Sequence, residues 1–242
     1  PTTNPPTIVN VGILHSRSGT MALSENTVAE AERLAIEEIN ADGGLNIKGR
    51  RVLIKAIEED GMADPATFAR QSAKLLDQQN VVAVFGGWTS WSRKAMIPIF
   101  KERGALLFYP VQYEGKECSA FVVYGGSVPN QQSTPAIAWM LANKSKRLVL
   151  IGSDYVYPKT ANRIIRAQAV KAGGTVIEEL YLPLGSRAVV PIIQTITTAQ
   201  DSDPVVVINT LNGDSNIAFF SALHKAGLVG NPNVSVLSLS VS

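Results

Sequence analysis

The sequence predicts an α/β protein made of two doubly wound lobes with parallel sheets. Short apolar runs alternate with helical patterns along the whole chain, and this alternation is typical of parallel sheets that are covered by helices on both faces. About ten strands are expected, which is more than one open sheet usually holds. A flexible glycine pair that is followed by Pro129 marks the natural boundary. We therefore expect lobe 1 at residues 1–126 and lobe 2 at residues 127–239.

The elements of the first half follow from apolar periodicity and from helix start and stop signals. Leu34 and Ile39 lie on one face of a helical pattern, and the Gly43–Gly44 pair ends it. Asp64 followed by Pro65 is a strong helix start, with the acid as N-cap and the proline at the first helical position. The expected strands are residues 8–14, 51–58, 81–85, 105–108 and 121–124, and the expected helices are residues 28–40, 92–103 and the one that starts at Asp64.

The second half repeats this rhythm. Residues 205–209 are expected to form a five-residue apolar strand, and the helix after it is expected to turn Ile217 and Phe220 inward. Trp139, at helical spacing, is expected in the core. The expected strands are residues 147–152, 175–182, 205–209 and 234–239, and the expected helices are residues 132–143, 191–199, 214–226 and one that follows Pro158 and ends near Gly173.

Composition and motifs exclude several functional classes. The 22 basic and 20 acidic residues are interspersed, which argues against nucleic-acid binding. No run approaches the roughly 18 apolar residues of a membrane span. The single cysteine, Cys118, and the two histidines, His15 and His224, are not spaced as metal ligands. No nucleophile elbow, phosphate loop or dinucleotide-binding fingerprint is present. We expect neither an enzyme nor a metal or cofactor.

The most informative segment is residues 86–93, which read Gly-Gly-Trp-Thr-Ser-Trp-Ser-Arg. It lies where a strand leads into a helix, so unpaired backbone N–H groups and the positive end of the helix dipole face a small acceptor. The tryptophans offer flat apolar faces. The segment predicts a site for a small planar group with a carbonyl or carboxylate. Two simpler interpretations remain open: the glycines serve only a tight turn, and Ser90 or Ser92 is only the N-cap.

Other expected strand ends are polar or aromatic as well, and in open α/β sheets ligands bind at the carboxyl ends of the strands. Five such ends carry aromatic, amide or hydroxyl side chains, a coherent pattern for a small polar ligand. Asp214 is most simply the N-cap of its helix, and His224 lies near a helix C-terminus, where positive charge is favoured. The strand-end loops are residues 15–19, 86–90, 109–113, 152–157 and 210–214.

The chain resembles the type I periplasmic substrate-binding proteins of ABC transporters, the leucine/isoleucine/valine-binding group, and within it the urea and short-chain-amide branch. This resemblance implies a Venus-flytrap fold in which two lobes close over a ligand, an ABC transporter permease as partner, and a periplasmic or extracytoplasmic location. Membrane association would come only through the transporter or a lipid anchor. The likeness rests on the strings GGWTSWSRKA from Gly86, LFYPVQYEG from Leu107, PNQQ from Pro129, GSDYVYP from Gly152 and NTLNGDS from Asn209.

The resemblance also assigns ligand-binding roles. Ser90 would hold the ligand carbonyl or carboxylate, Trp88 would form a wall of the site, and Tyr155 would close over the ligand from lobe 2. Tyr109 and the backbone near Val111 and Gln112 would supply contacts from lobe 1. The full set of candidate ligand-binding residues is Trp88, Thr89, Ser90, Tyr109, Val111, Gln112, Tyr155, Tyr157, Asn212 and Asp214.

Chains of this family run longer, and their C-terminal segment returns to complete lobe 1. The resemblance therefore implies a C-terminal truncation, with residues 240–242 at the start of a second crossover. No acidic partner for a ligand amine is evident, which slightly favours urea or a short-chain amide. A branched-chain amino-acid binder of the same fold, a cytosolic amide sensor that regulates an amidase operon, and an α/β enzyme acting on amides are the alternatives.

Overall fold

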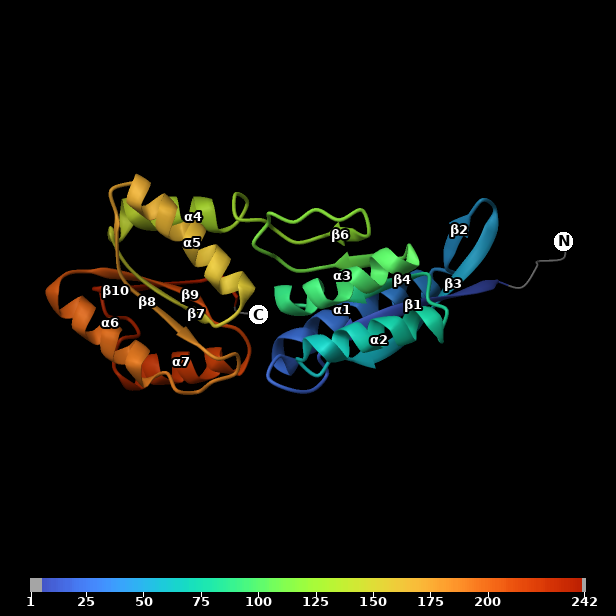
Figure 1. Ribbon diagram of the computed structural model, residues 1–242, viewed down its shortest axis with the longest axis horizontal. Helices are drawn as coiled ribbons and strands as arrows, with labels where there is room; N and C mark the ends of the chain where they lie inside the picture. The colour runs from blue at the N-terminus through green and yellow to red at the C-terminus, as the bar shows by residue number, and fades with distance from the viewer. Residues whose placement is uncertain (1–5, 241–242) are drawn as a thin grey trace. The chain divides into compact units, whose positions relative to one another are not determined.

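The computed structural model describes residues 6–240, and helices and strands alternate through this range (Figure 1). Contacts within the chain divide it into two compact units. The first unit runs to Val111 and includes Glu117–Gly126. The second unit takes Gln112–Lys116 and the chain from Ser127 onward. The linker between the sheets is therefore shared between the units, so the boundary is more complex than a single cut in the sequence.

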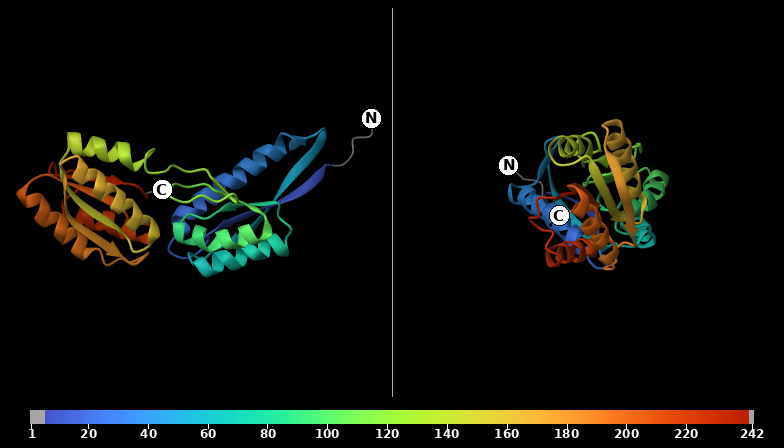
Figure 2. Two further views of the ribbon diagram at one scale, coloured as in Figure 1. Left: turned by 45° about the horizontal axis from the view of Figure 1, so that its top comes forward. Right: turned by 90° about the vertical axis from the view of Figure 1, so that its left-hand side faces the viewer.

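The first unit holds a six-stranded sheet and three helices. Its elements are β1 (Thr7–His15), α1 (Ala22–Ala41), β2 (Leu45–Ile47), β3 (Arg50–Asp60), α2 (Pro65–Asp77), β4 (Ala83–Gly86), α3 (Ser90–Arg103), β5 (Leu106–Tyr109) and β6 (Val122–Tyr124). The strand order is β2-β3-β1-β4-β5-β6. Within this unit, α1 covers one face of the sheet, and α2 and α3 lie side by side on the other (Figure 2). This is the doubly wound arrangement that the sequence predicts.

Two features of the first unit differ from the sequence-based expectation. The short strand β2 was not predicted, and it pairs antiparallel with β3, so this sheet is mixed rather than wholly parallel. Lys48 and Gly49, both at positive φ, form the tight turn that such a hairpin needs. Helix α1 also begins at Ala22, before the expected start at residue 28. Its first turns include Glu25, Asn26 and Thr27, which interrupt the apolar pattern and hide the true start.

The second unit holds a four-stranded sheet and four helices. Its elements are α4 (Ser133–Asn143), β7 (Arg147–Ser153), α5 (Val156–Lys171), β8 (Thr175–Leu182), α6 (Val190–Ser202), β9 (Val205–Thr210), α7 (Asp214–Lys225) and β10 (Val234–Ser238). The strand order is β10-β9-β7-β8, and every pairing in it is parallel. This sheet has the topology that the alternating sequence pattern predicts.

The core of the second unit shows why its central strands contain uninterrupted apolar runs. Side chains alternate between the two faces of a strand. Leu148 and Leu150 of β7 pack with α4 and α5 on one face, whereas Val149 and Ile151 pack with α6 and α7 on the other. All four side chains are fully buried. A strand segment that is covered on both faces is apolar at successive positions, as residues 148–151 of β7 are.

The placement of Trp139 in the core was wrong. Trp139 is 54% exposed on α4, and the Lys144 Nζ lies 5.7 Å from its ring centroid. The buried face of α4 is formed instead by Ile137, Met140 and Leu141. Within the part of the chain that the structure describes, no helix is both long and apolar enough to cross a bilayer.

Candidate functional site

The sheet of each unit has a point at which the chain reverses its direction of winding. In the first unit, α1 leads from β1 to β3 on one side, and α2 then leads back to β4 on the other side of β1. In the second unit, β7 and β9 flank the corresponding point. Loops that leave neighbouring strands at such a point diverge and form the usual ligand crevice of open α/β sheets. The loops after β1, β4, β7 and β9 are therefore the places to look for a site.

The glycines after β4 are required by the path of the backbone. A Cβ on Gly86 would lie 2.0 Å from the carbonyl oxygen of Leu14 at the end of β1, and Gly86 has a φ of 153°. Gly87 also has a positive φ, and its N–H donates to the same Leu14 carbonyl at 2.9 Å. The glycines therefore do serve a tight turn. It is compatible with a site, because the close passage brings the ends of β4 and β1 together at the winding reversal.

The N-cap of α3 is Thr89, so the expectation of a cap at Ser90 or Ser92 was wrong. The Thr89 Oγ1 accepts a hydrogen bond from the Ser92 N–H at 3.0 Å and lies 2.7 Å from the Ser92 Oγ. Ser90 is the first helical residue and is 1% exposed, and Trp88 is also buried. Because Thr89 caps the helix, the Ser90 hydroxyl is placed at the positive helix end without serving as the cap.

Arg93 is a central residue of this turn that the sequence analysis did not select. Its side chain is fully buried. The Nη1 donates to the Ser90 Oγ at 3.0 Å, and the Nε donates to the Glu117 Oε1 at 2.7 Å. Its guanidinium carbon lies 4.7 Å from the centroid of the Tyr109 ring. The available signal was its spacing: a residue three positions after Ser90 lies on the same face of the helix.

Tyr109, at the end of β5, packs under the same turn. It is fully buried, and its hydroxyl donates to the Trp88 carbonyl oxygen. Val111 is also buried and ends the first segment of this unit. The structure therefore brings Trp88, Thr89, Ser90 and Tyr109 together, as one polar turn on an aromatic base.

The loop after β1 is fixed by a buried charged group. The His15 Nε2 lies 3.1 Å from the Glu32 Oε2, and its Nδ1 lies 3.5 Å from the Glu25 Oε2. Glu25 also accepts from the Ser16 backbone N–H at 2.6 Å. Burial alone would lower the pKa of His15, but its contacts with Glu25 and Glu32 raise that pKa to about 9. An imidazolium thus holds the first strand end against α1 at neutral pH.

In the second unit, Tyr155 and Tyr157 form a small aromatic cluster at the start of α5. Tyr155 occupies the N-cap position, both rings are buried, and their centroids are 6.4 Å apart. Burial raises the pKa of the Tyr157 hydroxyl, so it is neutral at physiological pH. These two residues follow β7, which is one of the two strands at the winding reversal.

Asn212, in the loop after β9, joins the two strand ends of the second unit. It is 1% exposed. Its backbone N–H donates to the Ser153 Oγ at 2.9 Å, and its Nδ2 donates to the Thr210 carbonyl at 3.1 Å. Ser153 and Thr210 are fully buried, and neither was selected from the sequence. The Asn212 side chain thus orders its own loop.

Two expectations about single residues need correction. Asp214 is not the N-cap of α7, because Gly213 occupies that position and Asp214 lies in the first helical turn. Gln112 was expected to contribute to the first lobe, but it groups with the second unit. Its Nε2 donates to the Leu239 carbonyl at 3.1 Å. His224 lies in the last turn of α7, as the dipole argument predicts.

The site that these contacts describe suits a small molecule with an acceptor oxygen. In the first unit, the N-terminus of α3 is the kind of helix end at which backbone N–H groups favour an acceptor oxygen, and Ser90 is its first helical residue. Among residues 6–240, no cluster of His, Cys, Asp and Glu side chains is arranged to hold a metal ion.

Comparison with known proteins agrees with this architecture. A curated protein of Brucella melitensis, described as Leu/Ile/Val-binding protein homolog 6, is 26% identical over 225 residues, which make up 91% of this chain and 55% of that protein. A solute-binding protein of an ABC transporter from Rhodopseudomonas palustris, solved with 4-hydroxybenzoate, has a similar structure with a TM-score of 0.80 at 20% identity. That match covers 96% of this chain and 61% of the other.

A third similar protein is the branched-chain amino acid transporter substrate-binding protein of Streptococcus pneumoniae, solved in complex with isoleucine. Its TM-score is 0.69 at 21% identity, over 84% of this chain and 57% of that protein. The chain spans little more than half the length of the curated relatives that it matches. The family model described as the periplasmic binding protein domain matches residues 9–242. The predicted α/β fold is therefore confirmed, and the chain belongs to the periplasmic binding protein domain family.

Proposed function

We propose that the protein is an extracytoplasmic solute-binding protein that captures a small polar solute between two lobes and delivers it to the permease of an ABC transporter. The observation that carries this proposal is the turn at the start of α3. There a buried serine follows a dedicated cap residue, at the winding reversal of the sheet. Aromatic residues next to both winding reversals, Trp88 and Tyr155, are suited to cover the faces of a flat guest.

Urea and short-chain amides are the first candidate ligands. Such a molecule has one carbonyl acceptor and several N–H donors, and each polar group that is buried without a partner costs about 1–3 kcal/mol. Ser90 and the α3 N–H groups suit the carbonyl. Acceptors for the N–H groups would come from the amide oxygens of Gln112 and Asn212, from Asp214, or from backbone carbonyls.

Branched-chain amino acids are the second candidate, and a specific observation favours them. The N-terminus of α3 carries partial positive charge and stabilises a carboxylate better than a neutral carbonyl. The names of the relatives agree, because one is called a Leu/Ile/Val-binding protein homolog and another was solved with isoleucine. The relative solved with 4-hydroxybenzoate adds aromatic acids to the ligands worth testing.

Isothermal titration calorimetry with urea, acetamide, leucine and 4-hydroxybenzoate tests the proposal. We expect saturable binding of at least one of these solutes, with a clear loss of affinity in Ser90→Ala. Ser202→Ala is the matched control, because Ser202 is exposed at the end of α6. Tighter binding of leucine than of urea and acetamide would overturn the urea/amide assignment, and no binding of any of the four would count against solute capture.

Two further experiments separate the remaining alternatives. An NMR spectrum of the bound solute after long incubation should show it unchanged, whereas turnover of an amide or of urea would support an enzyme. Genes for a permease and an ATPase next to the gene of this protein would support transport, whereas an antiterminator gene would support a cytosolic amide sensor.

A further inference from the structure

The second unit contains a cavity of about 640 Å³ that none of the candidate ligand-binding residues lines. Its walls are residues 113–116, residues 128–130 together with Thr134 of α4, and residues 163, 164 and 167 of α5. Small-molecule sites usually have volumes of roughly 300–1,000 Å³. The cavity is therefore large enough to hold a small solute of its own.

Contacts between the wall segments fix the shape of this cavity. The Tyr113 N–H donates to the Ser127 carbonyl oxygen at 3.1 Å, which joins the first segment to the chain just before α4. The Gln168 Nε2 of α5 donates to the Thr134 carbonyl oxygen at 2.7 Å, and α4 and α5 pack side by side (Figure 1). Because each wall segment is tied to another, the cavity is a preformed feature of the second unit.

Two basic side chains on different wall segments, Lys116 and Arg163, line the cavity. Among residues 6–240, neither of these side chains forms an ion pair or a hydrogen bond. Both residues are exposed, whereas Glu114, the acidic residue of the wall, is only 4% exposed. The cavity therefore presents two cations with a buried carboxylate behind them, and a concave surface with this excess of positive charge attracts anions.

The backbone at Lys116 adopts a conformation that is costly for a lysine. Lys116 has a φ of 58° and the preceding Gly115 a φ of 67°, a region that residues with a Cβ rarely adopt. Glycine would adopt this conformation without strain, yet position 116 carries a long cationic side chain. Strained residues cluster at functional sites, so this observation favours a role for the Lys116 side chain.

The remaining wall residues determine which kind of anion fits. Val128, Pro129, Ile164 and Ala167 give the cavity an apolar lining, which a bare inorganic anion would leave unfilled. A guanidinium such as that of Arg163 binds a carboxylate through two parallel hydrogen bonds. Two cations and an apolar lining together match a molecule with two carboxylates joined by an apolar spacer.

We propose that this cavity is a second ligand site, which binds a small dicarboxylate with Arg163 and Lys116 as its charge partners. This site goes beyond the proposed function and does not depend on it, because its walls contain none of the candidate solute-binding residues. Lys116 is the last residue of its segment before the chain re-enters the first unit. A bound dicarboxylate would therefore tie a linker segment to α5.

An NMR titration of the isotope-labelled full chain with glutarate tests this site. Glutaramide is the matched neutral probe, because it has the same carbon skeleton without charge, and inorganic phosphate is the probe without an apolar part. We expect glutarate to shift the backbone amide signals of Gly115, Asn130, Thr134 and Ile164 in a saturable way. Glutaramide should leave these signals unchanged, phosphate should bind more weakly than glutarate, and added salt should weaken glutarate binding.

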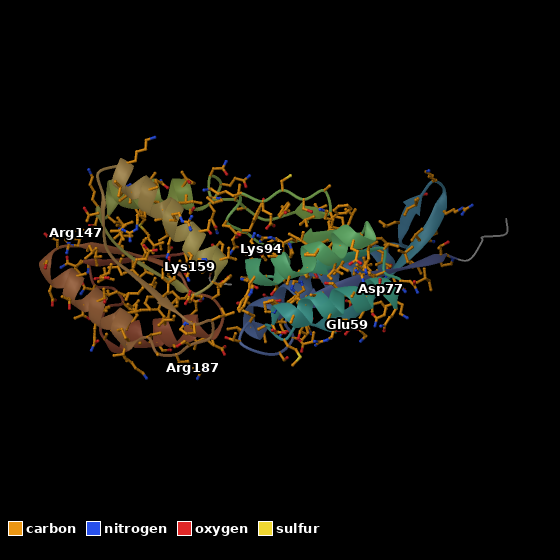
Figure 3. All side chains as sticks on the ribbon, viewed as in Figure 1. Glu59, Asp77, Lys94, Arg147, Lys159 and Arg187 are labelled. Carbon is orange, nitrogen blue, oxygen red and sulfur yellow. The ribbon has the colours of Figure 1, made fainter. Side chains whose placement is uncertain are left out.

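Variants of the two cations test their role. Arg163→Gln and Lys116→Gln should each weaken glutarate binding about tenfold, equivalent to about 1.4 kcal/mol. Arg187→Gln is the matched control and should bind as the wild type does, because Arg187 is an exposed arginine of the second unit that does not line the cavity (Figure 3). Lys116→Gly removes the same charge and relieves the positive φ, so weaker binding in this variant cannot be attributed to loss of stability.

Three results would overturn this inference: wild-type affinity in Arg163→Gln and Lys116→Gln, equal binding of glutaramide and glutarate, or no saturable shift of the cavity amides. Shifts confined to residues 86–93 would place glutarate at the candidate solute site; they would also overturn the inference while supporting solute capture. Failure of the protein to bind urea, acetamide, leucine and 4-hydroxybenzoate would instead contradict the proposed function and leave the second site standing.

Discussion

Gly86→Ala gives the sharpest test of how the turn is built. The new Cβ would lie 2.0 Å from the Leu14 carbonyl oxygen and 2.8 Å from its carbon, and the backbone cannot relieve this clash without parting β1 from β4. Strained φ values cost about 1–3 kcal/mol, and overpacking costs about 1–3 kcal/mol more. Gly49→Ala is the matched control, since Gly49 also has a positive φ but has nothing within 4 Å of the added Cβ.

The free energy of unfolding should therefore fall by about 3 kcal/mol or more in Gly86→Ala and by about 1 kcal/mol in Gly49→Ala. Both residues belong to the first unit, so the two variants report on the same sheet. Guanidinium chloride is the appropriate denaturant, because urea is a candidate ligand. Equal losses in the two variants would refute the reasoning, since both positions have a positive φ but only Gly86 adds the clash with Leu14.

Three further changes test other parts of the structure, each by guanidinium chloride unfolding. The folded-state pKa of His15 is about 9, against an ordinary value of 6.5, so the stability that protonated His15 contributes is full below pH 6.5 and is lost as pH rises through 9. His15→Gln should therefore flatten the dependence of the free energy of unfolding on pH in this range. A dependence parallel to that of the wild type would contradict this. Thr89→Ala should cost about 1 kcal/mol through loss of the α3 cap, and Thr89→Ser should restore most of it. Phe219→Ala should destabilise the second unit by about 3–5 kcal/mol, because its ring is fully buried between β9 and the helices on that face; a loss below 1 kcal/mol would be inconsistent with that packing.

The order of elements could be predicted because local signals and burial agree along most of the chain. β7 and β9 each contain a run of successive apolar residues, 148–151 and 205–208, because both of their faces are covered, and Asp64–Pro65 starts α2 where the capping rules place it. β2 escaped prediction because three residues carry no recognisable period. Trp139 shows the limit of spacing alone: it follows the helical period of α4, but it lies on the exposed side of the helix.

The placement of the candidate residues at strand ends was predictable but their contacts were not, and their role in binding stays a prediction. Turn residues after strands mark the carboxyl edge of a sheet, and this was enough to point to Trp88, Ser90, Tyr109 and Tyr155. Arg93 was missed because its significance comes from Glu117, which is 24 residues away in the sequence. No local sequence pattern predicts a contact between two residues that lie so far apart in the chain.

The turn of α3 combines contacts that are local in the sequence with contacts between distant residues. The backbone from Gly86 to Thr89 is fixed by local rules, namely close passage of β1 and capping of a helix. The Ser90 Oγ accepts from Arg93, and Arg93 is held by side chains drawn from α3, β5, β6 and the segment before β6. A change in those side chains can alter the surroundings of Ser90 without rebuilding the turn. Specificity in the first unit is therefore expected to be determined more by residues such as Arg93 and Glu117 than by the glycines and threonine that shape the backbone.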